Sequence, residues 1–244
     1  MCNRYLKVVS LSVHFFKYML KSLINLFFPK VCMGCKQVLL EQEKMICIHC
    51  LHELPLTNLH TNDSKVILKE FYGSVVLQHA TALFYYPKKG VVRQLIHHLK
   101  YKNQKQISSY LGKWLGLELK DCGYYNDIDV IIPVPLHNKR MRQRGYNQVE
   151  GFAKELALNL NAEYNDITLL RNKNSTTQTV KNRLTRWKNV QTIFEVTDFK
   201  TLNGKHILLV DDVITTGATI KACAAELNKI KNVKLSLAVM AYTQ

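Results

Sequence analysis

The chain of 244 residues is long enough for one large domain, or for one domain of ordinary size with a small additional module. Its content of 47% hydrophobic and 21% charged residues is typical of a soluble globular protein with a real core, and no motif supports a conventional redox enzyme or a protease. The 34 Lys and Arg residues outnumber the 18 Asp and Glu residues, so the formal net charge of +16 predicts attraction to polyanions such as nucleic acid, phosphorylated small molecules or an acidic membrane face.

Residues 1–28 read MCNRYLKVVSLSVHFFKYMLKSLINLFF and are apolar but interrupted by charge. Because Arg4, Lys7 and Lys17 are among the interruptions, no uncharged run approaches the ~20 residues of a membrane-spanning helix, and no small-residue cleavage site marks a signal peptide. We expect an amphipathic helical segment that packs on the body of the protein or rests on a membrane surface. The expected location is cytoplasmic, with a peripheral position at the inner membrane as the alternative.

Residues 29–60 contain two Cys-x-x-Cys pairs, Cys32 with Cys35 and Cys47 with Cys50. In a reducing compartment such pairs indicate metal ligands rather than disulfides. Each pair forms a tight knuckle whose sulfurs face one point about 2.3 Å from a zinc ion, and four thiolates leave no open coordination position, so the predicted zinc is structural. A redox pair, an iron–sulfur cluster and a site that has lost its metal are the alternatives.

From about residue 70 to residue 244 the sequence alternates between strand and helix patterns. Extended segments are expected at 73–86, 129–135, 206–210 and 234–243, and helices at 91–102, 106–120, 149–160 and 218–230. Strands that are apolar on both faces, alternating with amphipathic helices, predict an α/β fold with a parallel sheet covered on both sides. In such a fold, ligands bind at the carboxyl ends of the strands, where loops lead into helices.

Residues 207–219 read ILLVDDVITTGAT and place polar groups at such a strand end. The apolar strand delivers Asp211 and Asp212 to its carboxyl end, and small residues then lead into the next helix. Their backbone N–H groups, the helix N-terminus and the threonine hydroxyls can bind a phosphate. Two carboxylates beside a phosphate repel it unless they hold hydroxyl groups or a divalent cation, so a sugar phosphate is predicted. The candidate phosphate-binding residues are Thr215, Thr216, Gly217, Ala218 and Thr219.

Two further segments are rich in positive charge. After the strand at 129–135, a dense basic cluster can hold pyrophosphate or a nucleic-acid backbone, with a solvated basic loop as the alternative. Its members are Lys139, Arg140, Arg142 and Arg144. Residues 171–194 form a long polar connection, which we expect to be a lid over an anionic substrate or an inert surface loop.

Taken in order, these motifs resemble those of the ComF family of competence-related proteins. They are FFPKVCMGC with a second Cys-x-x-Cys, then LKYK, PVPL, RGYNQ and VDDVITTGAT. The last of them resembles the phosphoribosyl-pyrophosphate (PRPP) binding signature of type I phosphoribosyltransferases. The resemblance extends from about residue 27 to the C-terminus. It implies a type I phosphoribosyltransferase-like parallel sheet flanked by helices over 70–244, preceded by a small zinc-ribbon-like module.

The resemblance also implies roles for individual residues. Asp211 and Asp212 would bind the ribose 2′- and 3′-hydroxyls, and residues 215–219 would bind the 5′-phosphate of PRPP. The loop after Pro135 would face the pyrophosphate, and Mg²⁺ would bridge pyrophosphate and sugar. The candidate catalytic residues are Asp211, Asp212, Arg142 and Arg144. The substrate-binding set consists of both aspartates, residues 215–219, Lys100, Pro135 and Arg140.

Two functions are compatible with these motifs. The first is a phosphoribosyltransferase (a glycosyltransferase) that joins PRPP to an unknown acceptor, although no acceptor-binding hood can be matched in the chain. The second is a non-catalytic competence protein that handles single-stranded DNA with the same fold. Because the family is associated with DNA uptake, single-stranded DNA and other DNA-uptake proteins are further expected partners.

Overall fold

The computed structural model describes residues 19, 23, 25–61, 65–171 and 193–243. They divide into two compact units, one ending at Glu53 and the other beginning at Leu54. Most of the N-terminal segment expected at 1–28 and residues 172–192 of the expected lid lie outside the described residues. Within the described part, no helix combines the length and hydropathy needed to cross a membrane.

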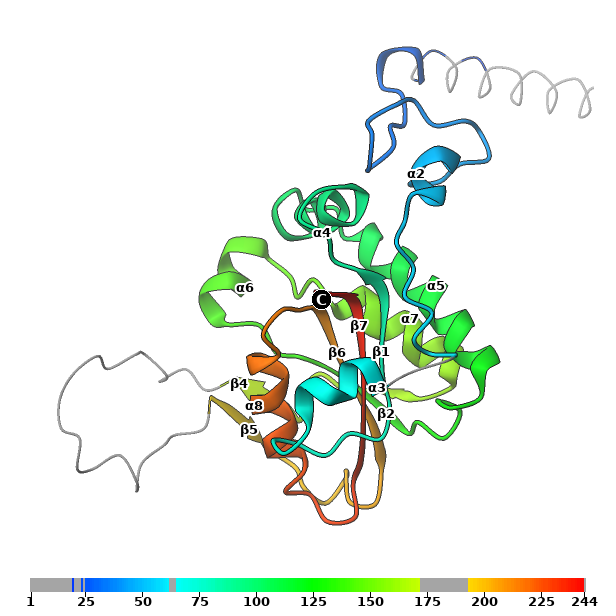
Figure 1. Ribbon diagram of the computed structural model, residues 1–244. Coiled ribbons are helices and arrows are strands. Elements are labelled where there is room, and N and C mark those ends of the chain that lie inside the picture. The colour runs from blue at the N-terminus through cyan, green and yellow to red at the C-terminus, as the bar shows by residue number, and fades with distance from the viewer. Residues whose placement is uncertain (1–18, 20–22, 24, 62–64, 172–192, 244) are drawn as a thin grey trace, which may run out of the picture. The chain divides into compact units, whose positions relative to one another are not determined.

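The second unit is built on a five-stranded sheet in which every neighbouring pair is parallel (Figure 1). The strand order is β1-β7-β6-β2-β3. The strands are β1 (Ala80–Tyr85), β2 (Val130–Pro133), β3 (Glu163–Tyr164), β6 (His206–Ile214) and β7 (Lys234–Tyr242). A separate antiparallel pair joins β4 (Leu169–Arg171) to β5 (Phe194–Val196). The predicted parallel sheet is therefore confirmed.

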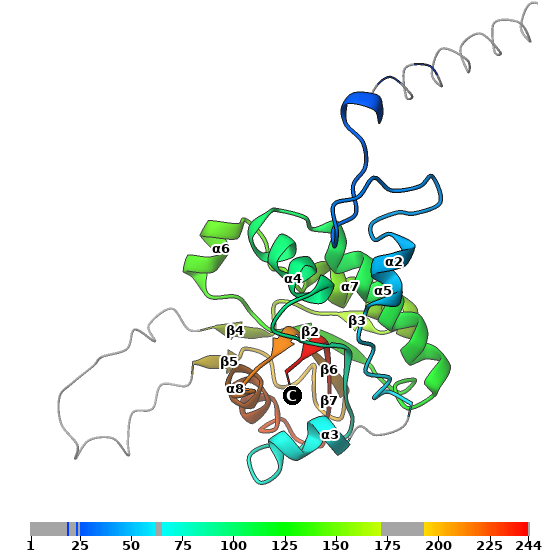
Figure 2. The same ribbon diagram turned by 45° about the horizontal axis from the view of Figure 1, so that its top comes forward.

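Helices cover both faces of this sheet. Helices α5 (Gln106–Cys122) and α7 (Glu150–Leu160) pack on one face, and α3 (Lys65–Leu68) and α8 (Ala218–Leu227) lie on the other (Figures 1 and 2). A single 3₁₀ turn, η1 (Lys69–Phe71), follows α3. Helices α4 (Val91–Tyr101) and α6 (Asn138–Arg144) lie beyond the carboxyl ends of the strands, where an α/β sheet binds ligands.

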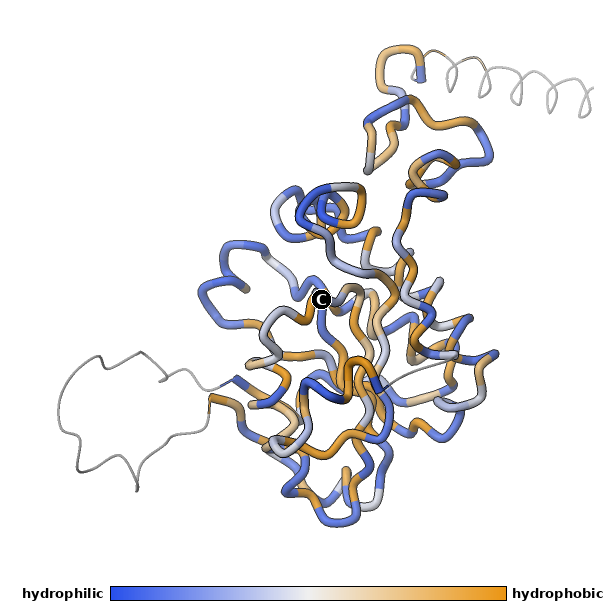
Figure 3. Tube along the Cα trace, in the orientation of Figure 1, coloured by the Kyte–Doolittle hydropathy of each residue, from blue (hydrophilic) through white to orange (hydrophobic). Residues whose placement is uncertain are grey.

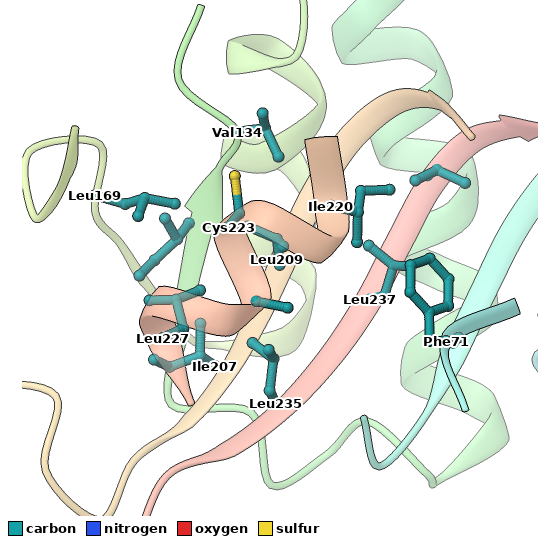
Figure 4. Packing of buried hydrophobic residues seen from close by; sticks show 14 of the residues in the cluster. Phe71, Val134, Leu169, Ile207, Leu209, Ile220, Cys223, Leu227, Leu235 and Leu237 are labelled. Carbon is teal, nitrogen blue, oxygen red and sulfur yellow. The ribbon is translucent and has the colours of Figure 1, made fainter. Parts of the chain in front are cut away.

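The apolar run of β6 explains why this strand is central. Ile207 and Leu209 lie under Cys223 and Leu227 of α8 (Figure 4), while Leu208 between them is buried on the other face of the sheet. Residues 207–210 are all buried, and the tube coloured by hydropathy is apolar along the middle of the sheet (Figure 3). A strand covered on both faces must be apolar throughout rather than alternating, which is the pattern of ILLV.

Close packing of α5 against α7 sets the position of the loop that precedes α7. A Cβ atom at Gly112 would lie 2.6 Å from the carbonyl oxygen of Phe152, and one at Gly151 would lie 2.6 Å from Ser109 Oγ. The Ser108 hydroxyl of α5 makes two hydrogen bonds to the start of α7. It donates to the Gln148 carbonyl oxygen (2.7 Å) and accepts from the Phe152 N–H (2.8 Å). The N-terminal end of α7 is therefore held tightly against α5.

The structure differs from the sequence expectation at three places. Strand β6 runs on to Ile214, because β7 continues beside it as far as Tyr242 and supplies partners for its last residues. The basic segment expected as a loop is helical: the His137 side chain caps α6 by accepting from the Lys139 N–H (3.1 Å), and Gly145 ends it at φ +73°. In 73–86, only the residues of β1 form a strand.

Candidate functional site

The turn from β6 into α8 is open to an anion. Gly217 is the N-cap of α8 at φ +67° and has no side chain to cap the helix, while the Ala218 N–H makes a long bond of 3.5 Å to Thr216 Oγ1. A Cβ at Gly217 would lie only 3.3 Å from the Phe71 ring, so glycine is favoured by both backbone conformation and space. Thr215, Thr216 and Thr219 are exposed. The N–H groups of this first turn, together with the adjacent threonine hydroxyls, provide donors suited to a phosphate.

Asp211 lies beside this turn. It lines a small cavity of about 40 Å³ together with residues 213–220, and it is partly exposed. Its Oδ1 accepts the backbone N–H of Asp212 (2.8 Å). Loss of hydration and the neighbouring Asp212 carboxylate raise the pKa of Asp211 to about 8. A ligand that offers hydroxyl groups or a cation would favour its charged form.

Asp212 is 6% exposed, and both of its carboxylate oxygens are engaged. Lys100 Nζ donates to Oδ1 at 2.9 Å, and Gln148 Nε2 donates to Oδ2 at 2.7 Å. Lys100 comes from the last turn of α4, and Gln148 comes from the loop before α7. The two aspartates are therefore not equivalent: Asp211 lines the cavity at the turn, whereas Asp212 joins β6 to two other elements.

Each residue of the RGYNQ motif (144–148) makes a defined contact. Arg144 Nη1 donates to Gln148 Oε1 at 2.7 Å, and Gly145 ends α6. The buried Tyr146 donates its hydroxyl to the carbonyl oxygen of Leu99 in α4. Asn147 Nδ2 donates to the carbonyl oxygen of Val134 at the end of β2 (3.1 Å). The motif thus ties together β2, α4 and α6 around the carboxyl end of β6.

Helices α4 and α6 line a cavity of about 580 Å³ that carries positive charge. Its lining residues are Lys100, Tyr101, Asn103, Arg140, Gln143, Arg144 and Tyr146. Three of these are cations and none is a carboxylate, and the Arg144 guanidinium lies 5.4 Å from the centre of the Tyr101 ring. This arrangement favours an anion of high charge density, such as pyrophosphate.

The predicted basic cluster is divided by α6. Arg140 and Arg144 line the cavity shared with α4, whereas Lys139 and Arg142 line a different hollow together with His137. Pro135 is partly exposed just after β2. A seven-residue helix points its side chains in different directions, so four neighbouring cations cannot all face one ligand.

Two residues of this region were missed by the sequence reasoning. Gln148 belongs to RGYNQ, but no local pattern in the sequence indicates its contact with Asp212. Arg171 ends β4, and its guanidinium lies 5.1 Å from the centre of the Phe194 ring. Burial and then the charge of Arg140 lower the pKa of Arg171, while Asp211 acts in the opposite direction. Arg171 is the first residue of the polar connection at 171–194, and that segment is the sequence signal for its position.

The first unit brings the four predicted cysteines together. The sulfur atoms of Cys32, Cys35, Cys47 and Cys50 all lie within 4.8 Å of one another. The Cys35 and Cys47 sulfurs are 3.6 Å apart, close to the roughly 3.8 Å between neighbouring ligands of a tetrahedral zinc ion. The short helix α2 (Ile48–His52) carries Cys50, and its His49 and His52 are exposed. The four cysteines can therefore hold one metal ion.

Hydrogen bonds and charge also fit a metal site. The N–H groups of Gly34 and Cys47 both point at Cys32 Sγ, at 3.3 Å. Although burial raises it, these and other backbone bonds bring the pKa of Cys32 down to about 6. Burial and the neighbouring thiols raise the pKa of Cys50. Four sulfurs at this spacing can all be thiolates only if a cation offsets their repulsion.

Residues 150–243 match the family described as "Phosphoribosyl transferase domain". This range contains both aspartates and the turn at 215–219, but neither the cysteine module nor α6. Among solved structures, the glutamine PRPP amidotransferase from B. subtilis complexed with ADP and GMP superposes with a TM-score of 0.42 and 16% identity, over 59% of this chain and 30% of that chain.

Three relatives align over most of the chain. The DNA utilization protein YhgH of Escherichia coli strain K12 is 27% identical over 80% of this chain and 82% of its own length. Competence protein F of Haemophilus influenzae is 28% identical over 82% of this chain and 85% of its own length. Competence protein ComFC of Bacillus subtilis is 23% identical over 80% of this chain and 76% of its own length. These alignments span about four fifths of the chain and include its phosphoribosyl transferase domain, so the protein is a homologue of proteins named for DNA utilization and competence.

Proposed function

We propose that the protein binds PRPP at the turn after β6 and transfers its phosphoribosyl group to a nitrogenous acceptor in connection with DNA uptake or utilisation. The observation that carries this proposal is the partly exposed Asp211 beside the N-terminus of α8, whose N-cap Gly217 has no side chain. The N–H groups and threonines at 215–219 hold the 5′-phosphate. Asp211 holds the ribose hydroxyls, and Asp212 keeps Lys100 in place beside them.

The cavity between α4 and α6 takes the pyrophosphate group of PRPP. When the C1–O bond breaks, its electron pair leaves with pyrophosphate, and C1 becomes oxocarbenium-like. Lys100, Arg140 and Arg144 offset the charge on the departing group. The acceptor nitrogen then bonds to C1 and releases a proton. Arg142, which lines the other side of α6, has at most an indirect role.

Two ions complete the proposal. The partly exposed carboxylate of Asp211 fits the preference of Mg²⁺ for oxygen ligands, and this ion would enter with PRPP and neutralise its pyrophosphate. In the first unit, the four-sulfur donor set and its spacing fit zinc. All four coordination positions would be filled by cysteine, so the zinc stabilises the fold and takes no part in transfer.

The affinity for PRPP is expected to rise with pH up to about 8. Asp211 without ligand has a raised pKa, so at lower pH binding must first remove its proton, and affinity falls by up to about tenfold per pH unit. Asp211→Asn should weaken PRPP binding at least tenfold and abolish this pH dependence. Calorimetry with Mg²⁺ and PRPP at pH 7, 8 and 9 measures both effects.

The matched control is Asp121→Asn, which changes an exposed aspartate at the far end of α5. It should leave both affinity and pH dependence unchanged. Unaltered PRPP binding by Asp211→Asn would contradict the site. Release of pyrophosphate from PRPP in the presence of acceptor pools tests transfer itself, and binding without release would reject the enzymatic part of the proposal.

A single-strand-binding function without transfer is the second candidate. It is favoured by Tyr101, which is 66% exposed beside Arg144 in the cation-lined cavity. Exposed aromatic rings among cations bind single strands by base stacking and phosphate contacts. The names of the relatives, DNA utilization protein and competence protein, point in the same direction.

If this second function holds, binding of an oligothymidylate should weaken steeply as salt increases. Tyr101→Ala should cost roughly 1–3 kcal/mol of binding free energy through lost stacking. Fluorescence anisotropy at several salt concentrations measures both effects. Tyr124→Ala is the control, since Tyr124 is also exposed but follows the far end of α5. Salt-independent binding, or equal losses in the two variants, would argue against this function.

A further inference from the structure

Gln148 connects the two halves of the proposed site through a chain of hydrogen bonds. Arg144 Nη1 donates to Gln148 Oε1 (2.7 Å), and Gln148 Nε2 donates to Asp212 Oδ2 (2.7 Å). Asp212 in turn accepts from Lys100 (2.9 Å). Gln148 is only 4% exposed, so these are its available partners rather than water. The relay, defined as Arg144–Gln148–Asp212, runs from the cation-lined cavity to the aspartate pair.

The chemistry of a carboxamide suits this position. Its oxygen accepts from the guanidinium while its nitrogen donates to the carboxylate, and the charges of the two partners allow only this orientation. Glutamate would place an oxygen against Asp212 where a donor is needed. An apolar side chain would leave both Arg144 and Asp212 with an unmade bond, which costs more when the groups are buried.

The backbone of Gln148 is held in place independently of its side chain. Its carbonyl oxygen accepts from Ser108 Oγ, which also accepts the N–H of Phe152 in α7. Gly151 lies against Ser109, where no Cβ would fit. Because the backbone is fixed, the amide cannot follow one partner without changing its bond to the other. The position of Asp212 and that of Arg144 are thus interdependent.

We propose that Gln148 is a positioning residue that couples the sugar-phosphate site to the cation-lined cavity. A ligand held by Asp211 steadies Asp212, whose backbone N–H donates to Asp211 Oδ1 (2.8 Å), and through Gln148 it preorganises Arg144 for a second anion. The identity of the two ligands, a pentose phosphate and a pyrophosphate group, rests on the proposed function. Preorganisation lowers the entropy lost when the second ligand binds.

Calorimetry on the full chain can measure this coupling with two probes, ribose 5-phosphate and magnesium pyrophosphate. The coupling factor is the Kd of pyrophosphate alone divided by its Kd in saturating ribose 5-phosphate. Gln148→Met removes the relay with little change in side-chain length. We expect it to lower the coupling factor about fivefold or more, while each probe alone still binds. The matched control, Gln94→Met on an exposed position of α4, should keep the wild-type factor.

A second variant keeps the test valid if methionine at this buried position destabilises the fold. Gln148→Glu retains the shape of the side chain but loses the donor toward Asp212, so it should also lose the coupling. Combining Gln148→Glu with Asp212→Asn reverses the donor and acceptor and restores the hydrogen bond. The coupling factor should then recover, even though the Asp212 change alters the affinity for ribose 5-phosphate itself.

The possible failures are distinguishable. If the wild-type protein does not bind ribose 5-phosphate, the proposed function is rejected and this inference with it. If both probes bind and a folded Gln148→Met or Gln148→Glu variant keeps the wild-type coupling factor, the proposed function stands and the role of Gln148 is overturned.

Discussion

Replacing Asp212 with alanine is expected to lower the free energy of unfolding by about 2–3 kcal/mol near pH 7. Its carboxylate accepts from Lys100 and from the buried Gln148, and its removal leaves the Gln148 amide without an acceptor. Breaking a buried pair by deleting one partner costs roughly 3–5 kcal/mol. We reduce that figure because Lys100 remains partly exposed and can turn to water. Denaturant unfolding of the second unit measures the change.

Asp211→Ala provides the control, with the opposite expectation. The pKa of Asp211 is raised in the folded protein, so its charged form is disfavoured there relative to the unfolded chain. For a carboxyl with a raised folded pKa, stability declines as pH rises from the unfolded value near 4 toward about 8. Removing this group should therefore preserve or increase stability at pH 7–8. Equal losses in the two variants would show that the aspartates are equivalent, contrary to the geometry.

Cys50→Ser is expected to abolish metal binding and to unfold the first unit. Cys50 is buried among the other three sulfurs, and the described residues of this unit include few buried apolar side chains that could replace the metal. Structural zinc in small four-ligand sites contributes apparent binding free energies of roughly 10–16 kcal/mol near pH 7. The wild-type protein should contain about one zinc per chain, and the variant should contain none.

Hydrogen exchange reports the structural consequence. Amides of residues 30–53 should lose protection in Cys50→Ser, and in the wild-type protein after chelation of zinc. Cys122→Ser is the matched control, because Cys122 ends α5 in the second unit and its thiol donates to the Leu119 carbonyl oxygen (3.2 Å). The Cys122→Ser variant should retain both its zinc and the protection of these amides from exchange. Zinc bound at full stoichiometry by Cys50→Ser would refute the four-cysteine site.

The relation between the two aspartates has a functional consequence as well. The charged form of Asp211 lowers the stability of the folded protein, and a ligand bound to its carboxylate would offset that loss. Binding sites commonly contain residues that reduce stability in this way. Asp212 carries a stabilising role and no free oxygen. A variant series at both positions therefore separates loss of binding from loss of fold, which a single aspartate variant would confuse.

The sequence by itself determined those features of this protein that depend on residues close together in the chain. The apolar run before Asp211 required a strand buried on both faces, and the alternation with amphipathic helices required a parallel sheet. Two Cys-x-x-Cys pairs predicted the cluster of four sulfurs, because each knuckle is formed by residues close in sequence. The small residues at 215–219 predicted an open helix N-terminus for the same reason.

Only the tertiary structure decided how the charged residues are distributed. Asp212 meets Lys100 and Gln148 from positions more than sixty residues away in sequence, so no local pattern could reveal that both its oxygens are engaged. The turn of α6 places Arg144 in the cavity and Arg142 outside it, although the two are only two positions apart in the sequence. Spacing along the chain specifies which groups one element can present, whereas packing between elements decides which of them meet.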